Sequence, residues 1–212
     1  MKTPLAALNI YNGLLQGETK ELPELQEFAV LSEKELDRIE TLVQNLLKIT
    51  KLDAGSIVFE KTLENVADMM GEVELHFAYR AAQEKKELVL SGEEHISLLC
   101  DHDWMIEAVE NIVKNSFDHT QKGDFVRMEW KQSASMVQIR ITDNGSGIHP
   151  EDLHHIFKRF YRSRFSKDQQ GIGLGLPLAK MIVEAHNGTI EVSSEPGTGT
   201  TFVLNFLITA IS

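Results

Sequence analysis

A long run of apolar residues at helical spacing sets the first limit on how this chain can fold. Between residues 24 and 52, apolar side chains recur every third or fourth position with Glu, Lys and Arg between them, which predicts one long amphipathic helix. A shorter helix is expected over residues 5–16, and the stretch around Gly17 and Pro23 separates the two. The start of the chain therefore predicts an antiparallel helical hairpin. The apolar positions of the long helix are Phe28, Leu31, Ile39, Leu42, Leu46 and Ile49.

Two antiparallel helices cannot by themselves bury an apolar stripe on each. A second copy of the chain would cover both stripes through residues 5–52 as a four-helix bundle, and we favour this homodimer. The alternative is that the stripes pack on the second half of the same chain. Gly55 is expected to cap the end of the long helix. The stripe of the shorter helix consists of Leu5, Leu8, Tyr11, Asn12 and Leu15.

Beyond residue 55 the helical periodicity gives way to a mixture of strands and helices. The mixture predicts an α+β chain: a hairpin over residues 1–55, a connector strand over 56–64, and an α/β sandwich over 65–212 in which helices cover one face of a mixed sheet. Helices are expected over 65–85, 102–118 and 176–188, the last of them ending at Gly188. Strands are expected over 87–92, 95–100, 125–132, 136–143, 189–195 and 200–208.

The charge balance and the amino-acid usage exclude several classes of protein. The formal net charge of −11 argues against a nucleic-acid partner, because phosphate backbones attract clustered Lys and Arg. The single cysteine, Cys100, allows no internal disulfide, suits a reducing compartment and is expected to be a small buried residue. No stretch approaches the ~20 apolar residues that a membrane helix needs.

Three glycine clusters carry the first indication of chemistry. They read DNGSGI at residues 143–148, GIGLGL at 171–176 and GTGT at 197–200. The second opens onto a predicted helix, where glycines let backbone N–H groups approach a phosphate at the positive helix end. It lacks the spacing of the dinucleotide fingerprint, and the chain has no Walker sequence. One cluster alone is explained as a turn, whereas three together favour a phosphate-binding site.

Three polar side chains indicate a nucleotide and a metal ion. Asp143 ends a predicted strand, where its carboxylate would accept a hydrogen bond from an exocyclic amine such as that of adenine, or would only cap the turn. Asn111 and Asn115 share one helix face, and amide oxygens suit a Mg²⁺ ion that also holds phosphates. A basic run nearby is either a solvated face or a lid that contributes cations. Its members are Lys158, Arg159, Arg162, Arg164 and Lys167.

Five stretches, in this order, resemble the sequence boxes of bacterial two-component sensor histidine kinases, and more broadly those of the superfamily of gyrase, Hsp90 and MutL. NIVKNSFDHT resembles the Asn-rich box, DNGSGI the first glycine box, IFKRFYR the Phe box, GIGLGL the second glycine box, and GTGTTF the last glycine box. The resemblance covers nearly the whole chain. It implies the histidine-kinase ATPase fold for the second domain, with ATP and Mg²⁺ as cofactors.

The resemblance also implies roles for individual residues. Asp143 would bind adenine, and Asn115 would ligate Mg²⁺, with Asn111 as a second candidate ligand. Many family members carry a phosphate-contacting Lys three residues after the second Asn, where this chain has Asp118, which leaves the cationic role to the lid and His119. The expected ATP-binding residues are Asn111, Asn115, His119, Asp143, Gly145, Gly147, Ile148, Arg159, Arg162, Gly171, Gly173, Gly175, Leu176 and Thr200.

The residue at position 111 separates two branches of this superfamily. Members that activate water place a general-base Glu four residues before the Mg²⁺-binding Asn, whereas the amide of Asn111 cannot take a proton from water. Glu107 and Glu110 are expected to point away from that face. We therefore expect phosphoryl transfer to a protein acceptor rather than hydrolysis.

The first residues, MKTPL, resemble the end of the family's phosphoacceptor motif, His-Glu-x-x-Thr-Pro-Leu. The motif's His and Glu would precede Met1, and none of the eight histidines in the chain has a similar context. Thr3 would lie one turn after that His and orient a water for dephosphorylation of the regulator. We expect that this chain alone does not phosphorylate itself.

The resemblance finally implies a function for a longer parent protein. The γ-phosphoryl of ATP would pass to a histidine on the dimerisation hairpin and then to an aspartate on a response regulator receiver domain. The parent would be anchored in a membrane with this region in the cytoplasm. The alternatives are a non-catalytic nucleotide-binding scaffold, a phosphatase-type sensor without the phosphoacceptor, and a hydrolytic ATPase.

Overall fold

The computed structural model describes residues 2–18, 22–163 and 172–208, and its contacts divide the chain into two units. The first unit is Met1–Thr50 and the second is Lys51–Ser212. The domain limits expected from the sequence pattern, near residues 55 and 65, remain predictions.

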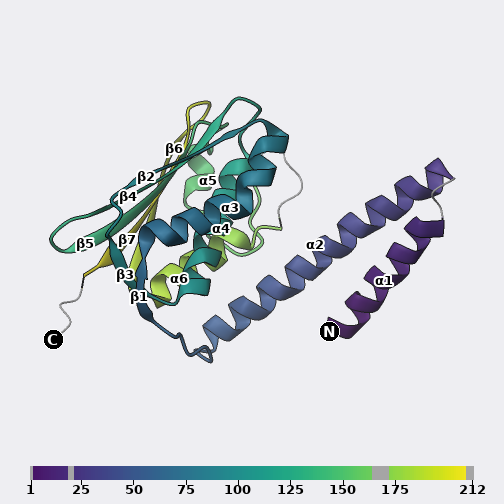
Figure 1. Ribbon diagram of the computed structural model, residues 1–212, viewed down its shortest axis with the longest axis horizontal. Coiled ribbons are helices and arrows are strands. Elements are labelled where there is room, and N and C mark those ends of the chain that lie inside the picture. Colours follow the sequence, from purple (N-terminus) through teal and green to yellow (C-terminus); the bar gives the residue numbers. More distant parts are fainter. Residues whose placement is uncertain (1, 19–21, 164–171, 209–212) are drawn as a thin grey trace. The chain divides into compact units, whose positions relative to one another are not determined.

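The first unit is a helical hairpin, as predicted. Helix α1 (Lys2–Glu18) and helix α2 (Pro23–Asp53) run side by side in opposite directions (Figure 1). The amide of Asn12 donates to the carbonyl of Ala29 at 2.9 Å, and the amide of Gln16 donates to the carboxylate of Glu33 at 2.8 Å. Helix α1 begins earlier than the apolar pattern indicated, because a proline in the first turn of a helix has no intrahelical N–H bond to lose.

The C-terminal end of α2 is capped by glycine, as predicted. Gly55 has a φ of +59° and donates its N–H to the carbonyl of Leu52 at 3.0 Å. The N–H of Ser56 donates to the carbonyl of Lys51 at 3.1 Å, which completes a Schellman motif. Neither hairpin helix, nor any other helix in the described part of the chain, has an apolar run that would cross a membrane.

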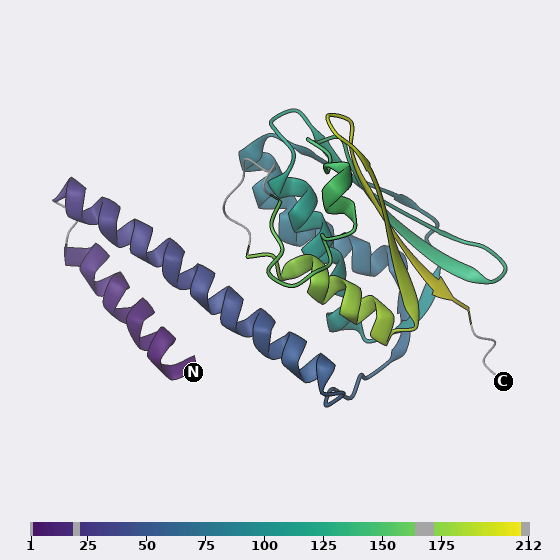
Figure 2. The ribbon, with the colours of Figure 1, turned by 180° about the vertical axis from the view of Figure 1, so that it is seen from behind.

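The second unit is an α/β sandwich, as predicted. Its five-stranded sheet has the order β2-β4-β5-β7-β6, with β2 parallel to β4 and all other neighbours antiparallel. The strands are β2 (Glu87–Gly92), β4 (Phe125–Gln132), β5 (Met136–Asp143), β6 (Gly188–Glu195) and β7 (Gly199–Leu207). Figures 1 and 2 show helices α3 (Val66–Glu84), α4 (His102–Asp118) and α6 (Gly175–Ala185) on one face of this sheet.

The core lies between that face and the three helices. In β4 and β5 every second side chain is buried, which is the alternation of a sheet covered on one side. The buried set from the sheet includes Val126, Met128, Ile139, Ile141, Phe202 and Leu204, and the set from the helices includes Ile112, Val113, Leu178 and Ile182.

The connector differs from the sequence expectation, because part of it pairs with another strand. Strand β1 (Thr62–Asn65) forms a separate antiparallel pair with β3 (Ser97–Cys100), and Thr62 lies opposite Cys100. Pairing between such distant segments leaves no local sequence signal. Cys100 is buried, as expected, and burial raises the pKa of its thiol to about 12, so this cysteine is unreactive.

The end of α6 and the short helix α5 also depart from the prediction. Helix α6 ends at Ala185 rather than Gly188, because Asn187 takes the left-handed conformation with a φ of +58°. Gly188 instead opens β6, where a Cβ would lie 2.6 Å from the ring of Phe206. The polar stretch after residue 144 contains α5 (Pro150–Leu153), which was not predicted.

Candidate functional site

Asp143 is a buried carboxylate at the end of β5, only 4% exposed. Its Oδ1 accepts hydrogen bonds from the N–H groups of Gly145 at 3.0 Å and Thr200 at 3.2 Å. Burial raises the pKa of the carboxyl, an effect opposed by the Ser116 hydroxyl and those two N–H groups. The Ser116 hydroxyl makes no hydrogen bond of regular geometry. Among the described residues, both regular hydrogen bonds to the carboxylate go to Oδ1 and none goes to Oδ2. Oδ2 is therefore available to a ligand.

The turn that follows Asp143 is packed against the end of α4. The N–H of Ser146 donates to the carbonyl of His119 at 3.0 Å, and a Cβ on Gly145 would lie 2.3 Å from the same oxygen. Gly147 has a φ of +69°, and a Cβ there would lie 2.1 Å from the carbonyl oxygen of Glu195. Close backbone approach therefore explains both glycines.

The last glycine turn closes onto the same loop. The N–H of Gly197 donates to the carbonyl of Ser146 at 2.8 Å, and the N–H of Ile148 donates to Ser194 Oγ at 2.8 Å. Ser194 Oγ also lies 3.0 Å from Thr200 Oγ1. The first and third glycine clusters thus form one assembly around Asp143. Ser194 was not among the expected site residues, and its position opposite Thr200 depends on strand pairing.

Asn111 lies against the first residue of α6. A Cβ on Gly175 would lie 2.7 Å from Asn111 Oδ1, while Asn111 Nδ2 donates to the carbonyl of Glu107 at 2.8 Å. The Glu107 carboxylate also lies 3.4 Å from Nδ2, so the expectation that Glu107 points away is wrong. Its i,i+4 spacing places it on the face of Asn111. Glu110 does point elsewhere, toward His76 of α3.

Asn115 follows one turn later on the same face and is half-buried. Its side-chain amide makes no hydrogen bond within the described part of the chain, so its oxygen is available to a cation. Asp118, at the position of the family's Lys, is instead bound by Arg80 at 2.7 Å and Lys114 at 2.9 Å. Among the described residues, no three His, Cys, Asp or Glu side chains group as a metal site.

The basic run is described only in part. Arg159 donates to Asp53 Oδ1 at 2.7 Å and, within the described residues, makes no hydrogen bond with Asn111 or Asp143. The base of the loop is closed, because the N–H of Phe160 donates to the carbonyl of Gly173 at 2.9 Å. Leu176 lies in the first turn of α6, and Arg162 precedes the gap in the description. Gly171, Arg164, Lys167 and the side chain of Thr3 lie outside the described residues.

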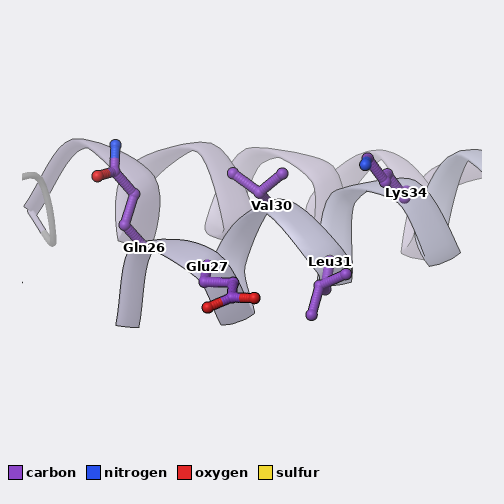
Figure 3. Close-up of a pocket in the computed structure, with 5 residues that line it drawn as sticks. All are labelled: Gln26, Glu27, Val30, Leu31 and Lys34. Atoms are coloured by element: carbon purple, nitrogen blue, oxygen red, sulfur yellow. The ribbon is translucent and has the colours of Figure 1, made fainter. Parts of the chain in front are cut away.

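A hollow of about 380 Å³ on the hairpin is unrelated to this site. The five residues that line it are all on α2, and Figure 3 shows Gln26, Val30 and Lys34 on one side with Glu27 and Leu31 on the other. Side chains that spread along a single helix do not converge on a ligand.

Comparison with known proteins matches two parts of the chain to known families. Residues 100–210 match the family of histidine kinase-, DNA gyrase B- and HSP90-like ATPases, and residues 1–55 match the His Kinase A phospho-acceptor domain. The chain belongs to this ATPase family, and its two modules are those of a bacterial two-component sensor histidine kinase.

Individual known proteins are similar to nearly the whole chain. The sensor histidine kinase YclK of Bacillus subtilis is 33% identical over 99% of this chain, which spans 45% of that protein. The full-length ShkA structure, solved with AMPPNP, shares the fold with a TM-score of 0.82 at 22% identity, over 99% of this chain and 44% of ShkA. Histidine kinase ThkA, solved with the response regulator TrrA, has a TM-score of 0.74 at 19% identity, over 98% of this chain and 58% of that one.

Proposed function

We propose that the second unit binds Mg·ATP, with adenine at Asp143 and the phosphates at the start of α6. The observation that carries the proposal is the buried Asp143 carboxylate, which accepts two backbone N–H groups through Oδ1 and, among the described residues, no hydrogen bond of regular geometry through Oδ2. The exocyclic amine of adenine donates a hydrogen bond and matches such an acceptor. The N-terminal end of α6 has no side-chain cap among the described residues, and it offers backbone N–H groups and the positive end of the helix dipole to an anion.

Asn115 is proposed as the Mg²⁺ ligand, with Asn111 as the second candidate. The residues fit this role: the amide of Asn115 is unpartnered within the described residues, and contacts with Glu107 fix Asn111 so that its Oδ1 faces Gly175. Hard cations such as Mg²⁺ prefer oxygen ligands. A bound Mg²⁺ would neutralise phosphate charge, which these two side chains could not do alone.

We further propose that the longer protein transfers the γ-phosphoryl of ATP to a histidine of the hairpin, and then to a response regulator. The phospho-acceptor match and the amide at position 111, which cannot serve as a general base, support transfer over hydrolysis. In this scheme the chain's own residues bind and orient the nucleotide. Thr3 is proposed to assist dephosphorylation of the regulator, and a membrane anchor is proposed for the parent.

The hairpin is proposed to form a homodimer through residues 5–52. In the single chain most of its apolar stripe is exposed, including Tyr11 at 61% and Phe28 at 67%. Apolar surface of this extent on a two-helix unit favours a covering partner, and a second hairpin completes a four-helix bundle.

The test of nucleotide binding is calorimetric titration of the 212-residue chain with a non-hydrolysable ATP analogue, with and without Mg²⁺. We expect saturable binding that tightens with Mg²⁺. A folded chain that releases or absorbs no heat at any analogue concentration, and protects no amide from exchange, would overturn the proposal.

A further inference from the structure

A charge network joins the ends of α3 and α4 beside the proposed site. Arg80 donates through Nε to Glu84 at 2.6 Å and through Nη2 to Asp118 at 2.7 Å. Lys86 pairs with Glu84 at 2.6 Å and donates to the carbonyl of Phe117 at 2.6 Å, with its side chain only 7% exposed. Both cations are therefore held in place by protein groups.

Lys114 differs from these two cations. Its side chain is 57% exposed, and Asp118 is its one ion-pair partner among the described residues. An ammonium group has three donors, so Lys114 has donors to spare. Lys114 lies three residues after Asn111 and four before Asp118, which places it at the border of the face that carries the two asparagines.

The charge network neutralises the carboxylate of Asp118, which would otherwise disfavour phosphate binding. An unpaired carboxylate at position 118 would repel the phosphates of ATP, where many family members place an attractive Lys. Paired with Arg80 and Lys114, Asp118 belongs to a three-residue group that carries one net positive charge.

We propose that Lys114 supplies the phosphate-directed cation that many family members supply from position 118, with Asp118 neutralised by Arg80. The inference rests on the proposed function, since it assigns a residue to the phosphate end of that site. It makes Lys114 a binding residue for the polyphosphate and not for the base.

The experiment compares Lys114→Met with Lys131→Met, which removes the same charge from an exposed site on β4. We expect Lys114→Met to weaken binding of the Mg²⁺ complex of the ATP analogue about tenfold, as for a lost charge-assisted contact, and to change adenosine affinity by less than about twofold. Lys131→Met should leave both affinities within about twofold of the unmodified chain.

The possible results distinguish failure of the Lys114 assignment from failure of the proposed function. An equal loss for ATP analogue and adenosine, or a loss no greater than that of Lys131→Met, would overturn the assignment. Adding Asp118→Lys to Lys114→Met should restore most of the affinity, and a folded double variant without recovery would contradict the equivalence of the two positions. Failure of the unmodified chain to bind the ATP analogue is a different result, and it would reject the proposed function itself.

Discussion

At the scale of the residue, the proposed nucleotide site centres on one buried carboxylate, Asp143. Asp143→Asn is the sharpest substitution, because the amide oxygen can still accept the N–H groups of Gly145 and Thr200. The amide nitrogen would then face the amine of adenine, and because both groups are hydrogen-bond donors, no hydrogen bond could form between them. We expect a loss in ATP affinity of about a hundredfold, with a melting temperature that is unchanged or higher since a buried charge is removed. Titration and thermal unfolding measure the two effects. Affinity within a fewfold of the original would contradict the adenine assignment.

Asn115 allows a test of the metal proposal at the same scale. Asn115→Ala removes the side-chain amide proposed as the Mg²⁺ ligand. We expect the ATP analogue to bind about as well as before in the absence of Mg²⁺, while the gain produced by Mg²⁺ falls by about tenfold. Titrations at several Mg²⁺ concentrations give the answer. An unchanged Mg²⁺ dependence would show that Asn115 is not a ligand.

Two glycines near the site provide a matched pair. Gly147 and Gly197 both have positive φ, but a Cβ on Gly147 would lie 2.1 Å from the carbonyl oxygen of Glu195, whereas one on Gly197 would meet nothing within 4 Å. Gly197→Ala should therefore lower the free energy of unfolding by about 1–2 kcal/mol from backbone strain alone. Gly147→Ala should cost about 1–3 kcal/mol more through the clash. Urea unfolding measures both, and equal losses would mean that the loop moves aside freely.

At the scale of the element, the connector docks onto the ends of α4 and α6. The ring of Phe59 packs edge-on against Trp104 and against His186, with centroid distances of 5.8 and 4.7 Å. His186 Nε2 accepts the N–H of Asp101 at 3.1 Å, and its Nδ1 lies 2.8 Å from the carbonyl of Ile182. This arrangement requires a neutral imidazole protonated on Nδ1. Burial lowers the pKa of His186 further.

The lowered pKa has a defined consequence for stability. A histidine that binds its proton more weakly when folded favours the native state above its unfolded pKa of about 6.5, and this contribution is lost as the pH falls through the folded value. We expect the free energy of unfolding to fall between pH 7.5 and 5.5, and His186→Gln to reduce that fall. His95→Gln, made at an exposed position, is the control for the substitution itself. Identical slopes in His186→Gln and the unmodified chain would contradict the account.

The hairpin's apolar stripe leads to a second prediction at this scale. Phe28→Glu should convert the proposed dimer to a monomer, because it places a charge in the stripe that a partner would bury. Leu75→Glu is the matched control, since Leu75 is 74% exposed on α3 in the other unit. Sedimentation equilibrium distinguishes the species. A dimer that survives Phe28→Glu, or that Leu75→Glu also disrupts, would place the interface elsewhere.

The helices and strands that could be predicted from the sequence are those with a strong local hydrophobic periodicity. The bounds of α4, β4 and β5 were predicted correctly, because each has strong periodicity and a clear end signal such as the Asp101 N-cap. Pairing of β1 with β3 was missed, since it joins segments with no local link. For the proposed site, Asp143 and the two asparagines were expected from motif and spacing, and their roles stay predictions. Ser194 was missed because only the β6–β7 register brings it to Thr200.

At the scale of the whole molecule, the chain combines a phospho-acceptor module with an ATPase module. The hairpin matches a phospho-acceptor domain, and the second unit matches an ATPase domain. In the proposed function, a nucleotide with its phosphates at the start of α6 and no general base at position 111 would donate a phosphoryl group to another part of a protein. The chain spans less than half of YclK.

Labelling with ATP that carries a radioactive γ-phosphate tests the central claim most directly. The chain as it stands should take up no acid-labile label, because none of its eight histidines has the motif context. A longer version, with upstream helix and His-Glu placed before Met1, should become labelled, and it should lose that label when the added His is Gln or when Asp143 is Asn. Acid-labile label on the original chain, or an unlabelled longer version that still binds ATP, would contradict the account.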